Sequence, residues 1–291
     1  PYVTFTAASE QTFTFSIPAD FRSALAENNE YFEYSVGGGE WTQFKTTVDS
    51  IKFGGTLGSL RLRGKSSKGT ATGYANYSRI HFTTENSPVD CTGDIRTLID
   101  YENYANANTT NARFCKLFLG NTELRTSPSL PAQSLADYCY YEMFNGCTAL
   151  TTAPELPAES LANNCYEYMF SDCTALTTAP ELPAETLADS CCLEMFRGCS
   201  KLTTAPALPA QSLAKSCYQG MFKNCTSLTT APTLPAGILA EYCYQEMFSG
   251  CSKLSSVTML ADDVSAQDCL FQWLIEAGTD VQESPKPTLY L

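Results

Sequence analysis

Fourteen cysteines are the residues of this chain with the greatest capacity for chemistry, and most of them recur at a fixed spacing. Two rows have one member every 26 residues: Cys139, Cys165, Cys191, Cys217, Cys243 and Cys269 form the first, and Cys147, Cys173, Cys199, Cys225 and Cys251 form the second. Cysteine can form disulfides, bind zinc or supply a nucleophile. Equivalent positions of stacked repeats share one environment, so this spacing indicates a structural role.

We favour buried free thiols for both rows. A cysteine side chain is small and largely apolar, so it suits a tight interior column. The alternative is a disulfide within each repeat, of the type Cys139–Cys147, which requires Cα atoms closer than about 7 Å. Zinc is less well supported, because zinc sites use short CxxC pairs or histidine partners and the chain has one histidine. We therefore expect no metal and no cofactor.

His81 is that histidine, and a Ser-His-Asp or Cys-His arrangement would have to use it. It lies in an Arg-Ile-His-Phe stretch that is typical of an ordinary strand. Two pairs of neighbouring carboxylates, Asp262/Asp263 and Asp100/Glu102, lie outside any recognisable calcium-binding loop, so solvated surface is the simpler interpretation. We expect no catalytic residues and a protein that is not an enzyme.

Aromatic residues are the candidates for binding. A row of tyrosines follows the first row of cysteines and consists of Tyr140, Tyr166, Tyr218 and Tyr244. Aromatic rings in register can bind peptides or sugars, and the alternative is that they stack on one another and shield the edge of each repeat. Trp41, beside the glycine turn 37–39, could stack on a sugar ring or could belong to the core of a β-sandwich.

These rows lie within a 26-residue repeat, LPAxxLAxxCYxxMFxxCxxLTTAPx. Its five copies begin at Leu130, Leu156, Leu182, Leu208 and Leu234. A fixed period of this length predicts a solenoid. Within a copy, Leu135, Cys139 and Met143 stand at i, i+4 and i+8 and predict a short helix. Leu150-Thr-Thr-Ala153 predicts a short strand before Pro154, stacked in parallel on its neighbours.

The terminal repeats depart from this pattern, as expected of units that cap an open core. Residues 104–129 keep the phase but have Asn121 where the second cysteine row would start, and the last repeat begins at Leu260. Positions that vary between copies indicate the surface, because packing does not fix them. One such pair of positions holds Asp137-Tyr138, Asn163-Asn164, Asp189-Ser190, Lys215-Ser216 and Glu241-Tyr242.

The part of the chain before the repeats has a β pattern. Apolar and polar residues alternate in 12–17 and 79–82, and glycines divide the expected strands near 37–39. Several short strands at such spacing predict an antiparallel β-sandwich. We therefore predict an α+β protein with a β-sandwich domain over 1–103 and a repeat solenoid over 104–291, with capping coils at both ends of the solenoid.

Charge excludes one class of partner. The net charge of the 291-residue chain is −13, and nucleic acid requires Lys and Arg to meet its phosphates. No stretch approaches the roughly 18 apolar residues of a membrane span, so we expect no transmembrane segment. Pro1 is not a natural start, and we expect a preceding segment, where a secretory or lipoprotein signal would stand.

The stretch LxxCYxxMFxGCTxLTTAPxLPA resembles the BspA-like leucine-rich repeats, the Treponema-type branch in which AFxxCxxL is followed by a proline-containing stretch. Cys147-Thr-Ala-Leu150 and Cys173-Thr-Ala-Leu176 stand at the CxxL of that family, with Met143-Phe144 at its AF. The resemblance covers about residues 104–275. The segment before it looks like the β domain that precedes such repeats in surface proteins of gut and oral anaerobes of the Bacteroides kind.

The resemblance implies a right-handed leucine-rich-repeat solenoid with 26-residue coils, a secreted or cell-surface location, and adhesion to host proteins, bacterial surface proteins or matrix proteins. We predict a non-enzymatic binding protein that acts through protein–protein interaction of its repeats. The alternative is a carbohydrate-binding surface protein that holds a glycan in the β-sandwich, for which Trp41 is the main support. A purely structural spacer would have no partner.

Overall fold

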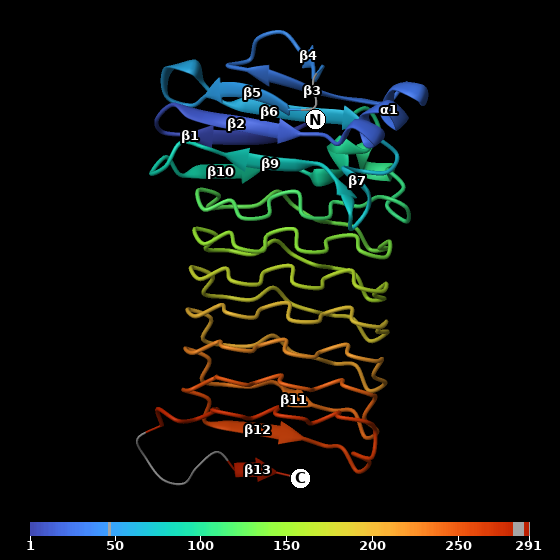
Figure 1. Cartoon of the computed structure of the whole chain (residues 1–291), viewed down its shortest axis with the longest axis vertical. Helices are drawn as coiled ribbons and strands as arrows, with labels where there is room; N and C mark the ends of the chain where they lie inside the picture. The colour runs from blue at the N-terminus through green and yellow to red at the C-terminus, as the bar shows by residue number, and fades with distance from the viewer. Residues whose placement is uncertain (46–47, 282–287, 291) are drawn as a thin grey trace.

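The computed structural model describes residues 1–45, 48–281 and 288–290. Small sheets form one end of the molecule and stacked repeats form the rest, so the two chain termini lie at opposite ends (Figure 1). The elements of the N-terminal part are β1 (Val3–Ala7), β2 (Gln11–Ser16), α1 (Ala19–Glu27), β3 (Tyr31–Val36), β4 (Thr42–Gln43), β5 (Val48–Phe53), η1 (Gly55–Leu57), β6 (Leu60–Lys65), β7 (Ala71–Gly73), β8 (Asn76–Tyr77), β9 (Arg79–Phe82), β10 (Val89–Thr92), η2 (Ile95–Leu98) and η3 (Tyr104–Asn106). The elements of the repeats are β11 (Thr233–Leu234), β12 (Ser256–Met259) and β13 (Thr288–Tyr290).

Two antiparallel sheets enclose an aromatic core in the N-terminal part. One has the strand order β10-β1-β6-β3-β4 and the other β5-β2-β9. Alternation along β2 buries Phe13 and Phe15. The ring of Phe5 on β1 lies 5.6 Å from that of Phe13, and the ring of Phe32 on β3 lies 5.4 Å from that of Phe15. Side chains of the two sheets therefore share one core.

The segment 136–147 of the first full repeat is a run of tight turns. Tyr138, Glu142 and Gly146 have φ of 60°, 49° and 72°, so a left-handed residue recurs every four positions. A right-handed helix excludes such residues. We call this segment and its equivalents at 26-residue spacing the turn ribbon. Its inward positions carry the Cys, Tyr, Met and Phe that recur between the repeats, all buried.

Backbone hydrogen bonds in the turn ribbon alternate between two directions. The N–H of Tyr141 donates within the repeat, to the carbonyl of Tyr138 at 3.4 Å. The N–H of its neighbour Glu142 donates to the next repeat, to the carbonyl of Glu167 at 2.9 Å. The same alternation runs through each ribbon, so stacking and local turning together satisfy the backbone. A helix would use every N–H locally and would leave none for the adjacent repeat.

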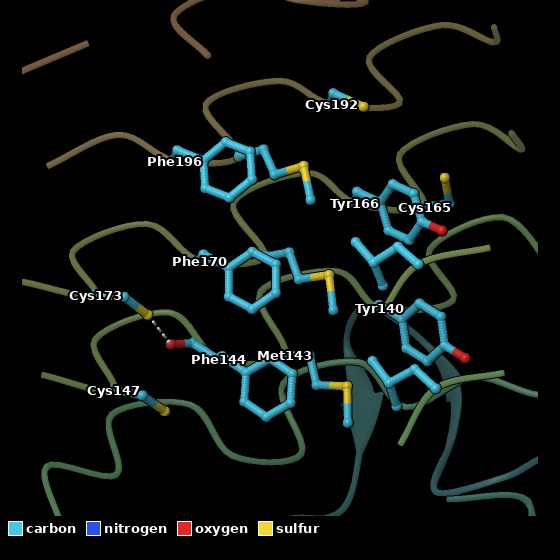
Figure 2. Packing of buried hydrophobic residues seen from close by; sticks show 14 of the residues in the cluster. Tyr140, Met143, Phe144, Cys147, Cys165, Tyr166, Phe170, Cys173, Cys192 and Phe196 are labelled. Carbon is cyan, nitrogen blue, oxygen red and sulfur yellow. Dashed lines mark hydrogen bonds between the residues drawn. The ribbon is translucent and has the colours of Figure 1, made fainter. Parts of the chain in front are cut away.

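Inside the stack, equivalent residues form columns. The phenylalanine rings at positions 118, 144, 170, 196, 222 and 248 stack with centroids 5.5–5.7 Å apart and planes within 8°. Methionines and leucines fill the space beside them (Figure 2). Each fully buried phenylalanine of this kind contributes about 2–3 kcal/mol to folding through burial.

The opposite side of each repeat makes short parallel contacts. Isolated bridges pair Thr152 with Thr178 and Thr204 with Thr230. Regular strands appear near the C-terminus, where β11, β12 and β13 form a parallel sheet of three strands. Prolines at each repeat interrupt donation to a longer ladder, which accounts for the isolated pairs.

The predicted fold class is wrong. Among the described residues the α-helix is α1, which lies outside the repeats, and the chain is β-rich with several small, mostly antiparallel sheets instead of an α+β arrangement with a right-handed leucine-rich-repeat solenoid. The helix predicted through Leu135, Cys139 and Met143 is absent, and in its place a ribbon of four-residue turns repeats its buried positions every four residues. That period is close to the 3.6 of a helix, and the apolar pattern does not distinguish the two.

The N-terminal sheets cover the first repeat directly. The N–H groups of Ile80, Val89 and Ile95 donate to the carbonyls of Leu117, Glu123 and Ser129 at 2.8–3.1 Å. One cluster of buried apolar side chains runs from β1 to the last repeat. The division into domains at 103/104 stays a prediction, and the two parts share both hydrogen bonds and a core.

Candidate protein-binding face

The tyrosine row lies inside the fold. Tyr140, Tyr166, Tyr218 and Tyr244 are buried. The rings of Tyr140 and Tyr166 stack at 6.1 Å (Figure 2), and those of Tyr218 and Tyr244 stack at 6.2 Å. Phe114 extends the row at one end, 6.1 Å from Tyr140, and Cys192 occupies the remaining position. Of the two interpretations given for this tyrosine row, ligand binding and mutual stacking, the structure shows the stacked arrangement. Burial raises the pKa of Tyr140 well above its usual value. A ligand would reach these rings only after the ribbon opened.

All fourteen cysteines are free and buried. In the second row each thiol donates to a phenylalanine carbonyl of the preceding repeat, as Cys173 Sγ does to Phe144 O at 3.1 Å (Figure 2). The same contact recurs at 3.0–3.1 Å for Cys147, Cys199, Cys225 and Cys251. Burial raises the pKa of Cys147 to about 12, so its thiol stays protonated at neutral pH. Both rows therefore serve packing, with no disulfide.

Trp41 lies apart from the tyrosine row, on the N-terminal sheets. The guanidinium carbon of Arg63 lies 3.9 Å from the centroid of its ring, and Tyr2 lies at 5.9 Å. Arg63 also contacts the ring of Tyr101 at 4.0 Å and pairs with Glu33 at 2.8 Å. One face of the indole is thus covered by a cation that is itself fixed, and Trp41 is half-buried outside the aromatic core.

His81 lies on β9, where Nδ1 is buried and meets no hydrogen-bond partner within the described residues. Burial lowers the pKa of His81. The two carboxylate pairs are engaged locally: Glu102 pairs with Lys65, and Asp263 accepts the N–H of Ser265 at 2.9 Å. Across residues 1–45, 48–281 and 288–290, no three His, Cys, Asp or Glu side chains are grouped to hold a metal ion.

The structure assembles a different set of aromatic residues on the surface. Tyr74, from the turn between β7 and β8, has its ring 5.2 Å from Tyr138 and 6.3 Å from Tyr141. Tyr141 in turn lies 5.7 Å from Tyr138 and 6.4 Å from Tyr168. We call these four residues the tyrosine patch. Tyr74 is 53% exposed and the other three are partly exposed.

The turn ribbon explains why these rings face outward. Buried residues occupy pairs of positions such as Cys139-Tyr140 and Met143-Phe144, so the intervening pair Tyr141-Glu142 points away from the core. Tyr168 occupies the outward position equivalent to Glu142 in the next repeat. Stacking then places rings of adjacent repeats side by side.

Charged groups accompany the patch. The ammonium of Lys116 lies 5.2 Å from the ring centroid of Tyr141 and 3.6 Å from a carboxylate oxygen of Glu142. Farther along the ribbon, Glu194 pairs with Arg197 and Glu246 with Lys223. The patch thus continues into a row of paired charges.

Glu167 differs from these glutamates, because no cation of the described residues lies within ion-pair distance of it. Burial, and then the charges of Glu142 and Glu194, raise the pKa of Glu167 to about 7, against a hydrogen bond from Asn164 that lowers it. A raised pKa means that burial and the neighbouring negative charges destabilise the ionised form of Glu167. A cation from a partner would stabilise that ionised form, so the site is suited to receive one. Partly exposed tyrosines beside it supply apolar area with few rotatable bonds and a polar tip.

Sequence reasoning identified Tyr138 as part of a variable surface position but missed Tyr74, Tyr141 and Tyr168. The available signal was compositional. Tyr141 and Tyr168 stand where other copies have Leu193, Gln219 or Glu194, so an aromatic residue at a variable position marks these two repeats. Tyr74 has no such signal, because its place beside the ribbon depends on how the N-terminal sheets cover the first repeat.

Comparison with protein-family models, with curated proteins and with solved structures finds no match for this chain. Among the described residues, no helix combines the length and the apolar character needed to cross a membrane.

Proposed function

We propose that the protein is a non-enzymatic binding protein that holds a protein partner at the tyrosine patch. The observation that supports this most is the contact of four partly exposed tyrosines from three segments of the chain, beside the unpaired Glu167. Tyrosines are enriched in protein interfaces and among the residues that dominate binding energy.

The chemistry of the patch favours a partner segment with an apolar or aromatic side chain next to a Lys or Arg. The cation would pair with Glu167, and the net charge of −13 would speed the approach of a basic surface. Following the resemblance to BspA-like repeats, we further propose a cell-surface or secreted location, with host, bacterial-surface or matrix proteins as the partners.

Retention of candidate partners by the intact chain tests the proposal. The wild-type protein and the triple variant Tyr138→Asn, Tyr141→Gln, Tyr168→Gln are applied to an array of matrix and bacterial surface proteins. Each introduced residue already stands at an equivalent position, in Asn164, Gln219 and Gln272. Tyr242→Asn is the matched control, because Tyr242 is the distant counterpart of Tyr138 and has a φ of 57°.

The proposal requires that wild type and control retain the same protein and that the triple variant loses it. A triple variant that binds as well as wild type would place the site elsewhere.

A second candidate function is glycan binding, favoured by a polar cleft between the N-terminal sheets and the first repeat. The cleft has a volume of about 520 Å³ and includes Lys65, Lys68 and Asp100. Its asparagines are Asn28, Asn29, Asn103, Asn106, Asn108 and Asn111. Amide and charged groups of this kind suit a polyhydroxylated ligand. Glycan retention lost in Asn29→Ala/Asn111→Ala and kept in the patch variant would favour this function.

A further inference from the structure

Along the last turn ribbon, residues 266–277, a row of backbone N–H groups has no acceptor among the described residues. In the ribbon before it, the N–H groups of Tyr244, Glu246 and Phe248 donate to the carbonyls of Cys269, Phe271 and Trp273 at 2.8–3.0 Å. The equivalent N–H groups of the last ribbon belong to Asp268, Leu270, Gln272, Leu274 and Glu276. Within the described part of the chain, none of these five meets an acceptor. We call this row the amide edge.

Among the described residues, the amide edge presents donors, and the carbonyls along it already accept hydrogen bonds. The carbonyls of Cys269, Phe271 and Trp273 already accept from the preceding ribbon. Those of Leu270 and Gln272 accept local bonds from Trp273 and Ile275 at 3.3 and 3.2 Å. A chain that pairs with this edge must therefore offer carbonyls at alternate residues, as each repeat does to the one before it.

Side chains beside the amide edge are more apolar than at the same positions one repeat earlier. Phe271 is 50% exposed and Ile275 is 44% exposed. Their counterparts one repeat earlier are Gln245 and Ser249. A large aromatic and a branched aliphatic side chain on an outward surface gain by being covered.

We propose that the amide edge is a docking site for a repeat of the same 26-residue type carried by another polypeptide whose own carbonyl edge is uncovered. Such a repeat would continue the interface that already joins each ribbon of this chain to the next. This site is separate from the tyrosine patch, which lies over the first repeats, next to the N-terminal sheets.

A second copy of this chain does not fit the site. Its carbonyl edge is already covered, since the N–H groups of Thr70, Ile80 and Val89 donate to Arg113, Leu117 and Glu123 at 2.8 Å. Two amide edges brought face to face would oppose donor to donor. The occupant must therefore be a repeat whose backbone carbonyls at alternate residues do not already accept hydrogen bonds.

Hydrogen exchange of the full chain tests the proposal, with a synthetic peptide of residues 156–181 as the probe. In the free protein, the amides of Leu270, Gln272 and Leu274 are expected to exchange at least about a hundredfold faster than those of Tyr244, Glu246 and Phe248. Addition of the peptide, kept reduced, should slow these amides and change the fluorescence of Trp273, which lies on the same ribbon. A scrambled peptide of the same composition should do neither.

The variant Phe271→Gln/Ile275→Ser carries the residues of equivalent positions Gln245 and Ser249, so it should fold normally. It is expected to bind the peptide at least about tenfold more weakly. Equal protection of the two sets of amides in the free protein would overturn the proposal. A peptide that gives no protection at millimolar concentration would also overturn it. So would dimers of the chain alone that form with rising concentration and protect this edge.

Discussion

The N–H of Phe82 donates to Oδ1 of Asn121 at 2.9 Å, and the Asn121 amide nitrogen donates to the carbonyls of Ile80 at 2.7 Å and Phe118 at 3.2 Å. Asn121 stands where later repeats have a cysteine, whose thiol donates to a phenylalanine carbonyl of the preceding repeat. The asparagine replaces that bond with two bonds to β9 and one bond within its own repeat. It joins the N-terminal sheets to the first repeat through one fully buried side chain.

Replacement of this residue should weaken the junction. Asn121→Cys restores the regular row but removes both bonds to β9 and leaves the N–H of Phe82 buried without its acceptor. We expect a loss of about 1–3 kcal/mol in the free energy of unfolding, measured by urea titration. Asn145→Ser is the control, because Ser171 and Ser249 occupy its equivalent positions, and it should change stability by less than about 0.5 kcal/mol. An unchanged midpoint in Asn121→Cys would show that the link contributes little.

The thiols should be unreactive in the native protein. All fourteen are buried, and burial raises the pKa of Cys139 and Cys251 to about 12, so the reactive thiolate is scarce at pH 7. Incubation with a thiol reagent such as Ellman's reagent should label none of them at neutral pH and all fourteen after denaturation. Thr148→Cys adds an exposed thiol that should react at once and serves as the positive control. Rapid native labelling at several sites would contradict the packing.

Stability should fall between about pH 4.5 and pH 7 because of Glu167. Its folded pKa, raised to about 7, exceeds the usual glutamate value, so the folded state binds its proton more tightly than the unfolded state. The resulting stabilisation is complete below the unfolded pKa and is lost as the pH rises through the folded pKa. Glu167→Gln should remove this dependence and be more stable than wild type at pH 8 by about 1 kcal/mol, a value reduced for solvent screening.

Urea titrations of both proteins at pH 4.5 and pH 8 measure the difference. Glu155→Gln, at an exposed position, should follow wild type at each pH. Parallel curves for Glu167→Gln and wild type would mean that the carboxylate is well solvated.

Single substitutions in the tyrosine patch should reduce partner affinity unequally. Tyr141 contacts three rings of the patch, so Tyr141→Gln should cost about tenfold to a hundredfold in Kd for the partner found on the array. Tyr242→Asn should cost nothing measurable. Surface plasmon resonance with immobilised partner checks both, and unfolding midpoints equal to wild type exclude misfolding as the cause.

Trp41→Ala tests the glycan hypothesis based on Trp41, which is separate from the polar cleft. Trp41 lies on the N-terminal sheets under Arg63, away from the patch, so retention of a protein partner should be unaffected. Loss of the cation–π contact should lower stability by about 1 kcal/mol. If a glycan is held at Trp41, the variant should lose a retention on a glycan array that the wild type shows.

The sequence predicted part of this structure and for identifiable reasons. A 26-residue period requires that Cys147 and Cys173 occupy equivalent places, so burial of both followed directly. The path of the chain between them did not, because Leu135, Cys139 and Met143 recur every four residues in a helix and in the turn ribbon alike. Left-handed φ at Tyr138 and Glu142 carries no sequence signal, since neither residue type favours that region.

The candidate site was beyond sequence reasoning for a different reason. The tyrosines that repeat in register are the buried ones, such as Tyr140, because regularity is what packing imposes. The exposed tyrosines are irregular, and they meet only when adjacent repeats and the β7–β8 turn come together. Tyr74 and Tyr168 are brought near Tyr141 by tertiary structure alone.

Phenylalanine rings of adjacent repeats stack at a constant 5.5–5.7 Å. Because the repeats are stacked so regularly, equivalent positions on the outer surface of the turn ribbons are also regularly spaced. For each surface position of a repeat, the equivalent positions of the other repeats show which residue types this backbone accepts. A chosen pattern of side chains could therefore be introduced across several repeats with residues taken from equivalent positions. The spacing of those side chains against a flat target would be fixed by the stacking of the backbone.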